Sequence, residues 1–121
     1  MTLDSNRNVV FTRADVGSSV SLISNIALAT QQWYHFAAVC DGLDIKLYVN
    51  GILEDFATAG QVINSNNSNS ILFGAVDGAG LGAFSGSIDS VALYNIASSS
   101  VPTVFAEGPG ADRSSDSGIV A

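Results

Sequence analysis

The sequence is poor in cysteine and in basic residues, and each shortage excludes a class of site or partner. Its 121 residues contain one cysteine, Cys40, so an internal disulfide and a cysteine-rich zinc site are both excluded. Four Lys and Arg residues stand against eleven Asp and Glu residues, which gives a formal net charge of −7. Such a chain lacks the clustered cations that bind phosphate backbones or anionic lipid, so neither nucleic acid nor a membrane is expected as a partner.

Long hydrophobic runs are also missing. No stretch approaches the ~20 apolar residues that a transmembrane helix needs. Residues Met1 to Arg7 do not show the charged-then-apolar pattern of a signal peptide. If Met1 is the natural start, the lack of this pattern predicts that the protein does not use the ordinary secretory route.

What the sequence does contain is apolar surface for a core. Hydrophobic residues make up 47% of the chain and charged residues 12%. A disordered chain shows the opposite balance. The length suits one domain with a core of its own and is too short for two.

Strand signals recur along the chain, with Gly, Ser, Asn and Asp between them. The expected strands cover residues 8–13, 20–23, 33–41, 44–50, 52–56, 71–76 and 83–95. No long segment with the helical period occurs before residue 97. The pattern therefore predicts an all-β fold, an antiparallel β-sandwich or jelly roll.

The C-terminal end has a different composition. Ser98 to Ser100 could cap a short helix that holds Pro102 in its first turn. Residues 108–121 (GPGADRSSDSGIVA) read as an extended tail. We therefore expect a sandwich over residues 1–107 and a tail over residues 108–121 that a partner subunit holds in place.

A hairpin is predicted at Asn50-Gly51, because both residues tolerate the positive φ of a type I′ turn. A regular register would place Lys46 opposite Asp55, as a charge pair on the outer face. Glu54 would then point inward, where an unpaired carboxylate is costly. We therefore expect the strand to leave the sheet by Glu54.

The strand over residues 33–40 is apolar on both faces. Trp33, His35, Ala37 and Val39 share one face, and Tyr34, Phe36, Ala38 and Cys40 share the other. A strand with one solvated face alternates more cleanly. It is therefore either a central strand covered on both sides, which we favour, or one whose second face meets a partner.

Several motifs together resemble a known family. Residues 33–39 (WYHFAAV), 41–42 (DG) and 46–51 (KLYVNG) resemble the W-H-H-x-A, D-G and L-Y-V-[DN]-G motifs of laminin G-like (concanavalin A-like) jelly rolls. Residues 71–74 (ILFG) are similar to the L-x-[IF]-G strand of that family. Residues 84–95 (FSGSIDSVALYN) resemble its closing F-x-G-x-I-D-x-V-x-[IL]-Y-N strand. The resemblance implies structural roles for Trp33, His35, Asn50, Gly51, Gly86 and Asp89.

The chain also departs from this family. The early F-D-G and F-T-[VI]-x-x-W strands are absent, so the sequence resembles the later two-thirds of the fold. Missing strands leave open sheet edges that recruit partners. The gap could be filled by the chain's own N-terminus or by a neighbouring copy, or it could simply remain in a minimal sandwich.

Catalysis is not expected, although some relatives with this fold are glycosidases. Glycoside hydrolysis needs two carboxylates across a sugar cleft. The two glutamates, Glu54 and Glu107, fall on unrelated elements. His35, the one histidine, is interpreted as a packed residue of its strand. The sequence therefore predicts a protein that is not an enzyme.

Calcium is the one cofactor that the resemblance implies, since many laminin G-like domains hold Ca²⁺ at the sandwich rim. Oxygen ligands of the kind that Ca²⁺ prefers are available at Asp41, Asp44 and Asp77. The alternative is that these aspartates are solvated turn residues.

Glycan binding would use an aromatic platform next to a polar loop. The candidate residues are Tyr34, Tyr48, Asn64, Asn66 and Asn67. The alternative is that the tyrosines pack in the core and the asparagines only keep the loop soluble.

Two functions follow from these observations. The first is a non-catalytic structural or decorating protein of a larger assembly, such as a virion (phage) surface or fibre, that works through contacts with other protein subunits. The second is a carbohydrate-binding, lectin-like adhesion module that is extracellular or at a cell surface, with calcium as a potential requirement.

Overall fold

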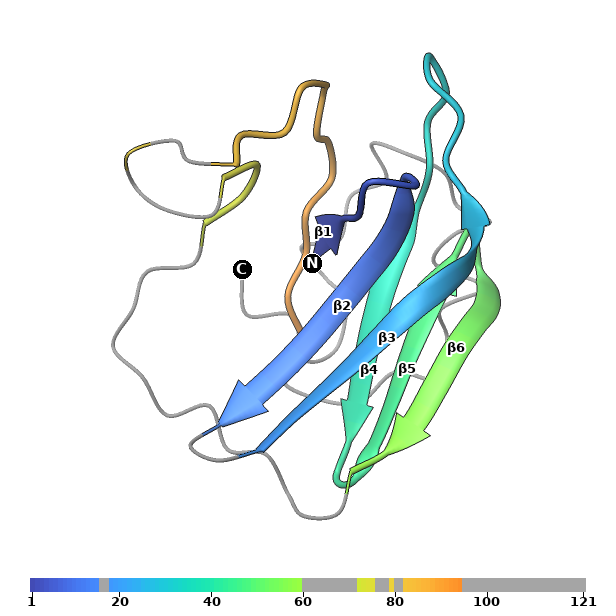
Figure 1. The fold of residues 1–121 in the computed structure, drawn as a ribbon, viewed down its shortest axis with the longest axis vertical. Coiled ribbons are helices and arrows are strands. Elements are labelled where there is room, and N and C mark those ends of the chain that lie inside the picture. The colour runs from blue at the N-terminus through green and yellow to red at the C-terminus, as the bar shows by residue number, and fades with distance from the viewer. Residues whose placement is uncertain (16–17, 60–71, 76–78, 80–81, 95–121) are drawn as a thin grey trace.

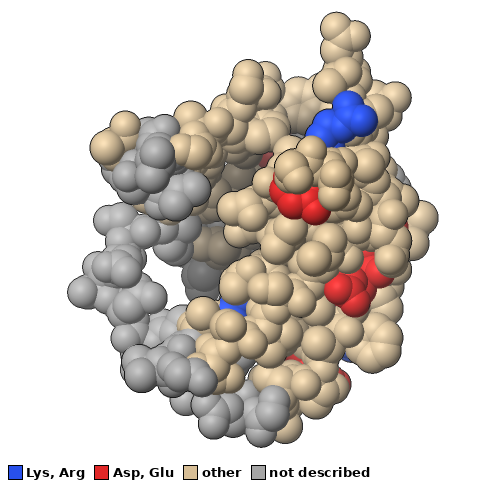
Figure 2. Space-filling view, viewed as in Figure 1, with Lys and Arg blue, Asp and Glu red and all other residues tan. Residues whose placement is uncertain are grey.

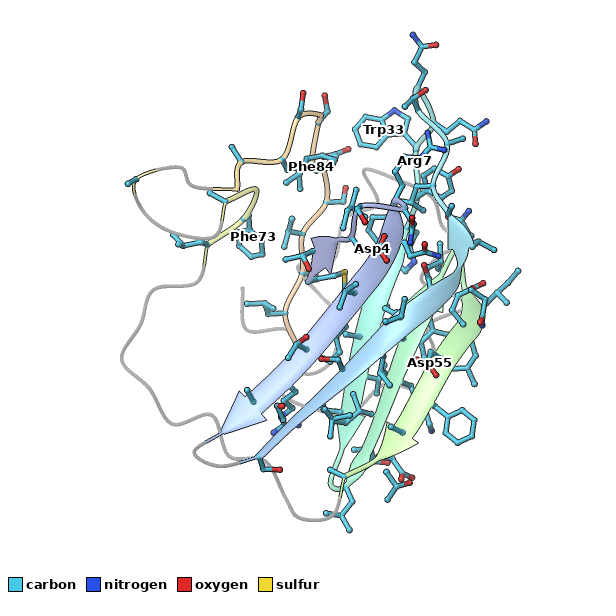
Figure 3. All side chains as sticks on the ribbon, in the orientation of Figure 1. Asp4, Arg7, Trp33, Asp55, Phe73 and Phe84 are labelled. Atoms are coloured by element: carbon cyan, nitrogen blue, oxygen red, sulfur yellow. The ribbon has the colours of Figure 1, made fainter. Side chains whose placement is uncertain are left out.

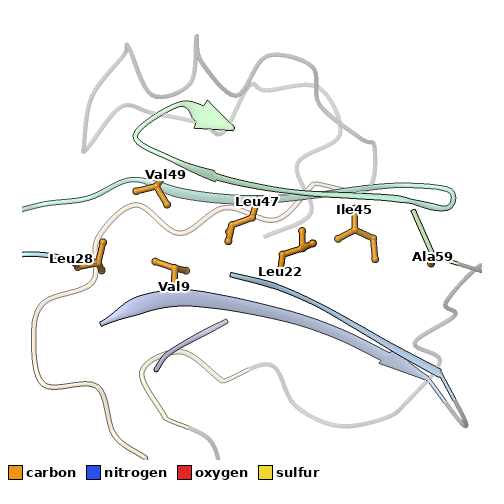
Figure 4. Close-up of a cluster of buried hydrophobic side chains, with 7 residues drawn as sticks. All are labelled: Val9, Leu22, Leu28, Ile45, Leu47, Val49 and Ala59. Carbon is orange, nitrogen blue, oxygen red and sulfur yellow. The ribbon is translucent and has the colours of Figure 1, made fainter. Parts of the chain in front are cut away.

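The computed structural model of the chain describes residues 1–15, 18–59, 72–75, 79 and 82–94 (Figure 1). Within these residues, six strands form two antiparallel sheets, each of three strands in sequence order. Sheet A contains β1 (Thr2–Leu3), β2 (Asn8–Asp15) and β3 (Ser18–Ala27). Sheet B contains β4 (Phe36–Asp41), β5 (Asp44–Val49) and β6 (Ile52–Thr58). The two sheets face each other (Figures 1 and 4), so the predicted all-β antiparallel sandwich is confirmed.

No helix of sufficient length and hydrophobicity to cross a membrane occurs in the described part of the chain. Three predictions fall outside the described residues: the C-terminal helix, the tail over residues 108–121, and the boundary between the tail and the sandwich.

The core lies between the two sheets and receives side chains from both (Figure 4). Its buried members are Val9, Leu22, Leu28, Ile45, Leu47, Val49 and Ala59. In β5, alternate residues point inward, as the period of a strand requires. Ser24 is the buried polar residue of this region; its hydroxyl accepts the Val9 N–H at 2.9 Å and donates to the Ile26 carbonyl at 2.8 Å.

The predicted Asn50-Gly51 turn is present, with φ of 52° at Asn50 and 75° at Gly51. The register then differs from the predicted one. Leu47 lies opposite Asp55 while Tyr48 lies opposite Leu53, so Glu54 is an extra residue in β6, a β-bulge.

Two predictions about β6 are therefore wrong. Lys46 lies opposite Phe56 and not opposite Asp55. The strand continues to Thr58 and does not leave the sheet at Glu54. The bulge replaces Glu54 by Asp55 at the position opposite Leu47, and the cost of a carboxylate there is reduced because Asp55 Oδ2 accepts the Ile23 N–H.

The carboxylates of the bulge connect the two sheets along one side of the sandwich. Asp55 Oδ2 accepts the backbone N–H of Ile23 at 2.9 Å, and Glu54 Oε2 accepts that of Asn25 at 3.0 Å. The Asn25 amide also donates to the Glu54 carbonyl. We call these four residues the carboxylate seam. It satisfies edge N–H groups of β3 that no neighbouring strand pairs, a common protection of an exposed sheet edge.

In the part of sheet B that the structure describes, β4 is not the central strand that its apolar faces predicted. Among the described strands it pairs with β5 alone and lies at the edge of sheet B. Its residues are half-buried from Phe36 to Cys40. Tyr34, Phe36 and Cys40 pack against the core, which explains one apolar face.

The predicted strands over residues 71–76 and 83–95 are wrong where the structure describes them. Residues 72–75 and 82–94 contain one isolated bridge, at Tyr94, and no strand. The backbone takes positive φ at Gly74 (77°), Gly82 (61°) and Ser90 (54°), and such residues interrupt an extended run. The Phe84 N–H donates to the Gly74 carbonyl at 2.7 Å and joins the two segments.

Candidate functional site

One end of the sandwich collects three connections, which we call the loop end. These are the β1–β2 turn (residues 4–7), the crossover from sheet A to sheet B (residues 28–35) and the β5–β6 turn (residues 50–51). They meet because β2, β4 and β6 begin where β3 and β5 end (Figure 1). Loops that a rigid scaffold positions in this way are where binding residues concentrate.

The β1–β2 turn is organised by Asp4. Its Oδ1 accepts the backbone N–H groups of Asn6 and Asn8, both at 2.8 Å, as aspartate does in turns. The Arg7 N–H donates to the Asp4 carbonyl at 3.0 Å. The Arg7 carbonyl in turn accepts the Leu28 N–H at 2.9 Å, which ties this turn to the start of the crossover.

The crossover is held at both of its ends. The Tyr34 hydroxyl accepts the Ala29 N–H at 3.0 Å and donates to Gln32 Oε1 at 3.0 Å, closing residues 29–34 into a loop. The Tyr34 ring lies parallel to that of Phe36, with centroids 6.3 Å apart. Further along, Asn50 Oδ1 accepts the His35 N–H at 2.9 Å, and the Asn50 N–H donates to the His35 carbonyl at 2.8 Å.

Trp33 lies in this closed loop and is 64% exposed. It precedes β4 and is outside the sheet. The resemblance implied a structural role for Trp33, and the structure places most of its side chain at the surface. Figure 3 shows its indole at the loop end, in the same part of the molecule as Arg7. Gln31 and Gln32, the residues before it, are exposed as well.

Backbone strain also concentrates at the loop end. Four non-glycine residues have positive φ in the described ranges, and three of them lie here: Arg7 (67°), Gln31 (60°) and Asn50 (52°). Asn50 tolerates this conformation in its turn, whereas Arg7 and Gln31 adopt it at a free-energy cost. Such strain persists where the surrounding structure fixes it, and it clusters at ligand sites.

The surface around these loops is sparsely charged. Figure 2 shows separate red and blue spots on a face that is mostly uncharged. The carboxylate of Asp4 is engaged with backbone N–H groups, and those of Glu54 and Asp55 belong to the carboxylate seam. The loop end therefore offers an aromatic plane, amides and one guanidinium, without a pair of unengaged carboxylates.

The residues predicted for calcium do not gather at this end. Asp41 and Asp44 lie opposite each other at the β4–β5 turn, which is at the other end of the sandwich. Asp44 Oδ1 accepts the Thr58 hydroxyl at 2.7 Å. Asp77 is outside the described residues. Among the residues that are described, no three His, Cys, Asp or Glu side chains gather closely enough to hold a metal ion.

The residues predicted for glycan binding do not form one platform. Tyr34 packs against the core, whereas Tyr48 alternates with core residues of β5 and points to the outer face of sheet B. The remaining candidates, Asn64, Asn66 and Asn67, lie outside the described residues.

The last two predicted structural residues lie in the segment that forms no strand. A Cβ on Gly86 would lie 2.6 Å from Phe84 Cε1, so the Phe84 ring occupies the space that a side chain at residue 86 would need. Asp89 Oδ1 accepts the N–H of Ser90 at 2.8 Å.

Sequence reasoning missed Arg7, Gln31 and Gln32 as neighbours in a site. The pair of glutamines directly before a tryptophan was a readable signal of a polar loop. The positive φ at Arg7 and Gln31 could not be predicted from residue type, because arginine and glutamine usually adopt other backbone conformations.

Comparison with known proteins agrees with the fold. The model of the concanavalin A-like lectin/glucanases superfamily matches residues 1–100. The match includes β1 to β3, which precede the motifs at residues 33–95 that carried the resemblance. Searches of curated proteins and of solved structures gave no significant match. Since the model covers more than half of the sequence, the chain belongs to the concanavalin A-like lectin/glucanases superfamily.

Proposed function

We propose that the chain is a non-catalytic carbohydrate-binding module that recognises glycans through Trp33 at the loop end. The observation that carries this proposal is the 64% exposure of Trp33 in a loop that Tyr34 and Asn50 hold in place. A free indole face complements the apolar C–H face of a pyranose ring. Because the loop is already ordered, binding costs less conformational entropy.

The neighbouring side chains suit sugar hydroxyl groups. The Gln31 amide can donate and accept hydrogen bonds, the Gln32 amide can donate while its Oε1 accepts the Tyr34 hydroxyl, and Arg7, at the same end of the sandwich (Figure 3), offers further donors. A ligand site commonly combines an aromatic surface with a few polar groups that fix orientation. The description of the superfamily, which includes lectins, agrees with this class of ligand.

That the module is non-catalytic is part of the proposal, and it follows from where the described carboxylates are engaged. Glycosidases place an acid and a second carboxylate on either side of the scissile bond. Here Glu54 and Asp55 accept backbone N–H groups of β3, and no such pair flanks Trp33 among the described residues.

A glycan array, followed by calorimetric titration of the best ligand, tests the proposal. Trp33→Ala should weaken binding by at least about tenfold, since truncating an aromatic hot spot costs ~2 kcal/mol or more. Ile23→Ser, which changes an exposed residue of sheet A, should bind like the wild type. The chain has one tryptophan, so its fluorescence should shift on binding. Absence of binding to every glycan, or full binding by Trp33→Ala, would contradict the proposal.

The same calorimetric titration shows whether glycan binding depends on calcium. If calcium takes part, the titration should lose its signal in EDTA and regain it on addition of Ca²⁺. The predicted ligands Asp41 and Asp44 lie at the end of the sandwich opposite to Trp33, so Asp44→Asn tests whether calcium at that distant turn affects glycan binding, with Trp33→Ala as the reference for loss of glycan contact.

A second candidate function is a structural subunit of a larger assembly. Exposed large apolar side chains on β6 favour it: Ile52 (65%), Leu53 (44%) and Phe56 (66%). Apolar surface of this kind marks protein contacts. Light scattering of the purified chain tests it, since an assembly subunit should form oligomers by itself or with an added partner. A location at a virion surface, or alternatively at a cell surface, remains a prediction from the sequence.

A further inference from the structure

The β5–β6 turn contains the one Asn-Gly sequence of the chain, at Asn50-Gly51. An asparagine before a glycine loses its side-chain amide readily, because glycine has no side chain that hinders attack by its backbone nitrogen. The Gly51 nitrogen bonds to Asn50 Cγ, the bond from Cγ to Nδ2 breaks, and ammonia leaves a succinimide ring. Water then opens the ring at either carbonyl and gives aspartate or isoaspartate. The reaction needs no reagent besides water.

The folded turn holds this pair in a conformation that does not react. Ring closure requires the Gly51 nitrogen and Asn50 Cβ to lie on the same side of the Cα–C bond of Asn50. The φ of 52° places Asn50 in the left-handed region, where ψ is about +30 to +60°. At such a ψ the Gly51 nitrogen lies nearly opposite to Cβ across that bond, turned away from Cγ. The backbone must therefore rotate before the ring can close.

Hydrogen bonds to the crossover oppose this rotation. Asn50 Oδ1 accepts the His35 N–H at 2.9 Å, and the Asn50 N–H donates to the His35 carbonyl at 2.8 Å. Val49 and Ile52, on either side of the turn, are partners in the ladder, and a two-residue loop leaves little freedom for one dihedral angle to change alone. A reactive conformation therefore requires the turn to open and its contact with His35 to break.

We propose that Asn50 is a deamidation site whose reactivity is gated by the β5–β6 turn, and that its isoaspartate product prevents the turn from closing again. Asn50 then reacts through local opening of the loop end, so the rate of its modification measures how often that opening occurs. The proposal does not depend on which ligand the loop end binds.

The two products have different effects on the loop end. Aspartate leaves the main chain unchanged, tolerates positive φ and offers an oxygen to the His35 N–H. In isoaspartate the main chain runs through the former side chain, which adds one methylene to a two-residue loop whose length fixes the register of the hairpin. The group that accepted the His35 N–H is then part of the main chain. Isoaspartate therefore removes the hydrogen bond that holds the end of the crossover.

Ageing of the full chain at mildly alkaline pH, with and without guanidinium chloride that unfolds it, tests the gating. Peptide mapping by mass spectrometry measures the conversion of Asn50, and enzymatic methylation quantifies isoaspartate. Conversion should be at least about tenfold slower in the folded chain, the ratio that corresponds to an opening free energy of about 1.4 kcal/mol. Asn50→Gly, which keeps a residue that tolerates positive φ but has no amide to lose, should form no isoaspartate at this position.

Refolding of the aged, unfolded chain tests the effect of the product on the turn. The His35 amide should exchange at least about fivefold faster in molecules that carry isoaspartate, the ratio that corresponds to the loss of one hydrogen bond of about 1 kcal/mol. A methyltransferase that converts isoaspartate to aspartate should restore the slow exchange. Asn50→Asp, which supplies the aspartate product in pure form, is the matched control, and its His35 amide should exchange like that of the wild type.

Three results would overturn the proposal. No conversion of Asn50 in the unfolded chain would show that it is not a deamidation site. Equal rates in the folded and the unfolded chain would show that the turn does not protect it. Exchange of the His35 amide at the wild-type rate in the isoaspartate form would show that the turn closes despite the added methylene. None of these results bears on glycan binding by the unmodified chain.

Discussion

Removal of the Asp55 carboxylate tests whether the carboxylate seam stabilises the sandwich. Asp55 Oδ2 accepts the Ile23 N–H at 2.9 Å, and its Oδ1 accepts the Phe56 N–H at 2.8 Å. A hydrogen bond to a charged group contributes about 1.5–3 kcal/mol. Water can reach this exposed edge and replace part of that bonding. We therefore expect Asp55→Ala to lower the free energy of unfolding by about 1 kcal/mol, or Tm by about 4 °C.

Amide hydrogen exchange followed by NMR gives the local readout. The Ile23 amide should exchange about fivefold faster in Asp55→Ala, which is the ratio that corresponds to 1 kcal/mol. Asn25, whose N–H is held by Glu54, should change less. Asp55→Asn is the matched variant. It keeps one acceptor oxygen and loses the charge, so its stability should lie between those of the wild type and Asp55→Ala.

Two results would refute this reasoning. If Asp55→Ala has the Tm and the Ile23 exchange rate of the wild type, the seam contributes nothing to stability. If Asp55→Asn is as unstable as Asp55→Ala, the negative charge matters and the hydrogen-bond geometry does not.

Three further substitutions give sharp expectations. Leu47→Ala should lower the free energy of unfolding by about 2–5 kcal/mol in urea denaturation, because Leu47 is fully buried between the sheets and truncation leaves a cavity; a loss below 1 kcal/mol would mean that the core collapses around the gap. Asn50→Gly keeps the positive φ but loses the acceptor for the His35 N–H, so thermal unfolding should show a free energy of unfolding that is lower by about 1 kcal/mol. Unchanged stability would show that only the backbone conformation matters at this turn. Trp33→Ala should change stability by no more than about 0.5 kcal/mol, because the side chain is mostly exposed; calorimetry that shows a larger loss would restore a packing role for Trp33.

Sequence reasoning predicted the fold where the signal was local. Alternation and turn residues identified the strands within residues 8–58 and the Asn50-Gly51 hairpin, because strand period and positive φ are encoded in residue type. The bulge at Glu54 was not predictable in this way. A bulge shifts the register by one residue, and here it is stabilised by backbone groups of β3 that are distant in sequence.

For the segments after residue 71, the sequence predicted strands that the described residues do not contain. Their apolar alternation resembled strands, yet Gly74, Gly82 and Ser90 adopt positive φ, and residues 72–75 and 82–94 contain no strand. For the candidate site, the family resemblance identified Trp33 but implied only a structural role for it. Its exposure depends on the way Tyr34 and Asn50 close the crossover, which is a tertiary contact that residue type does not reveal.

The arrangement of the described strands has a consequence for how the chain folds. Sheet A is built from residues 2–27 and sheet B from residues 36–58, and the crossover is the chain's single passage between them in this part of the structure. Each sheet can therefore form from successive hairpins whose pairing is local in sequence, and local pairing favours rapid folding. The slow step is then the docking of one finished sheet on the other. A chain cut within the crossover should separate into two halves that each contain three strands, and their recombination would measure the strength of the sheet-to-sheet contact directly.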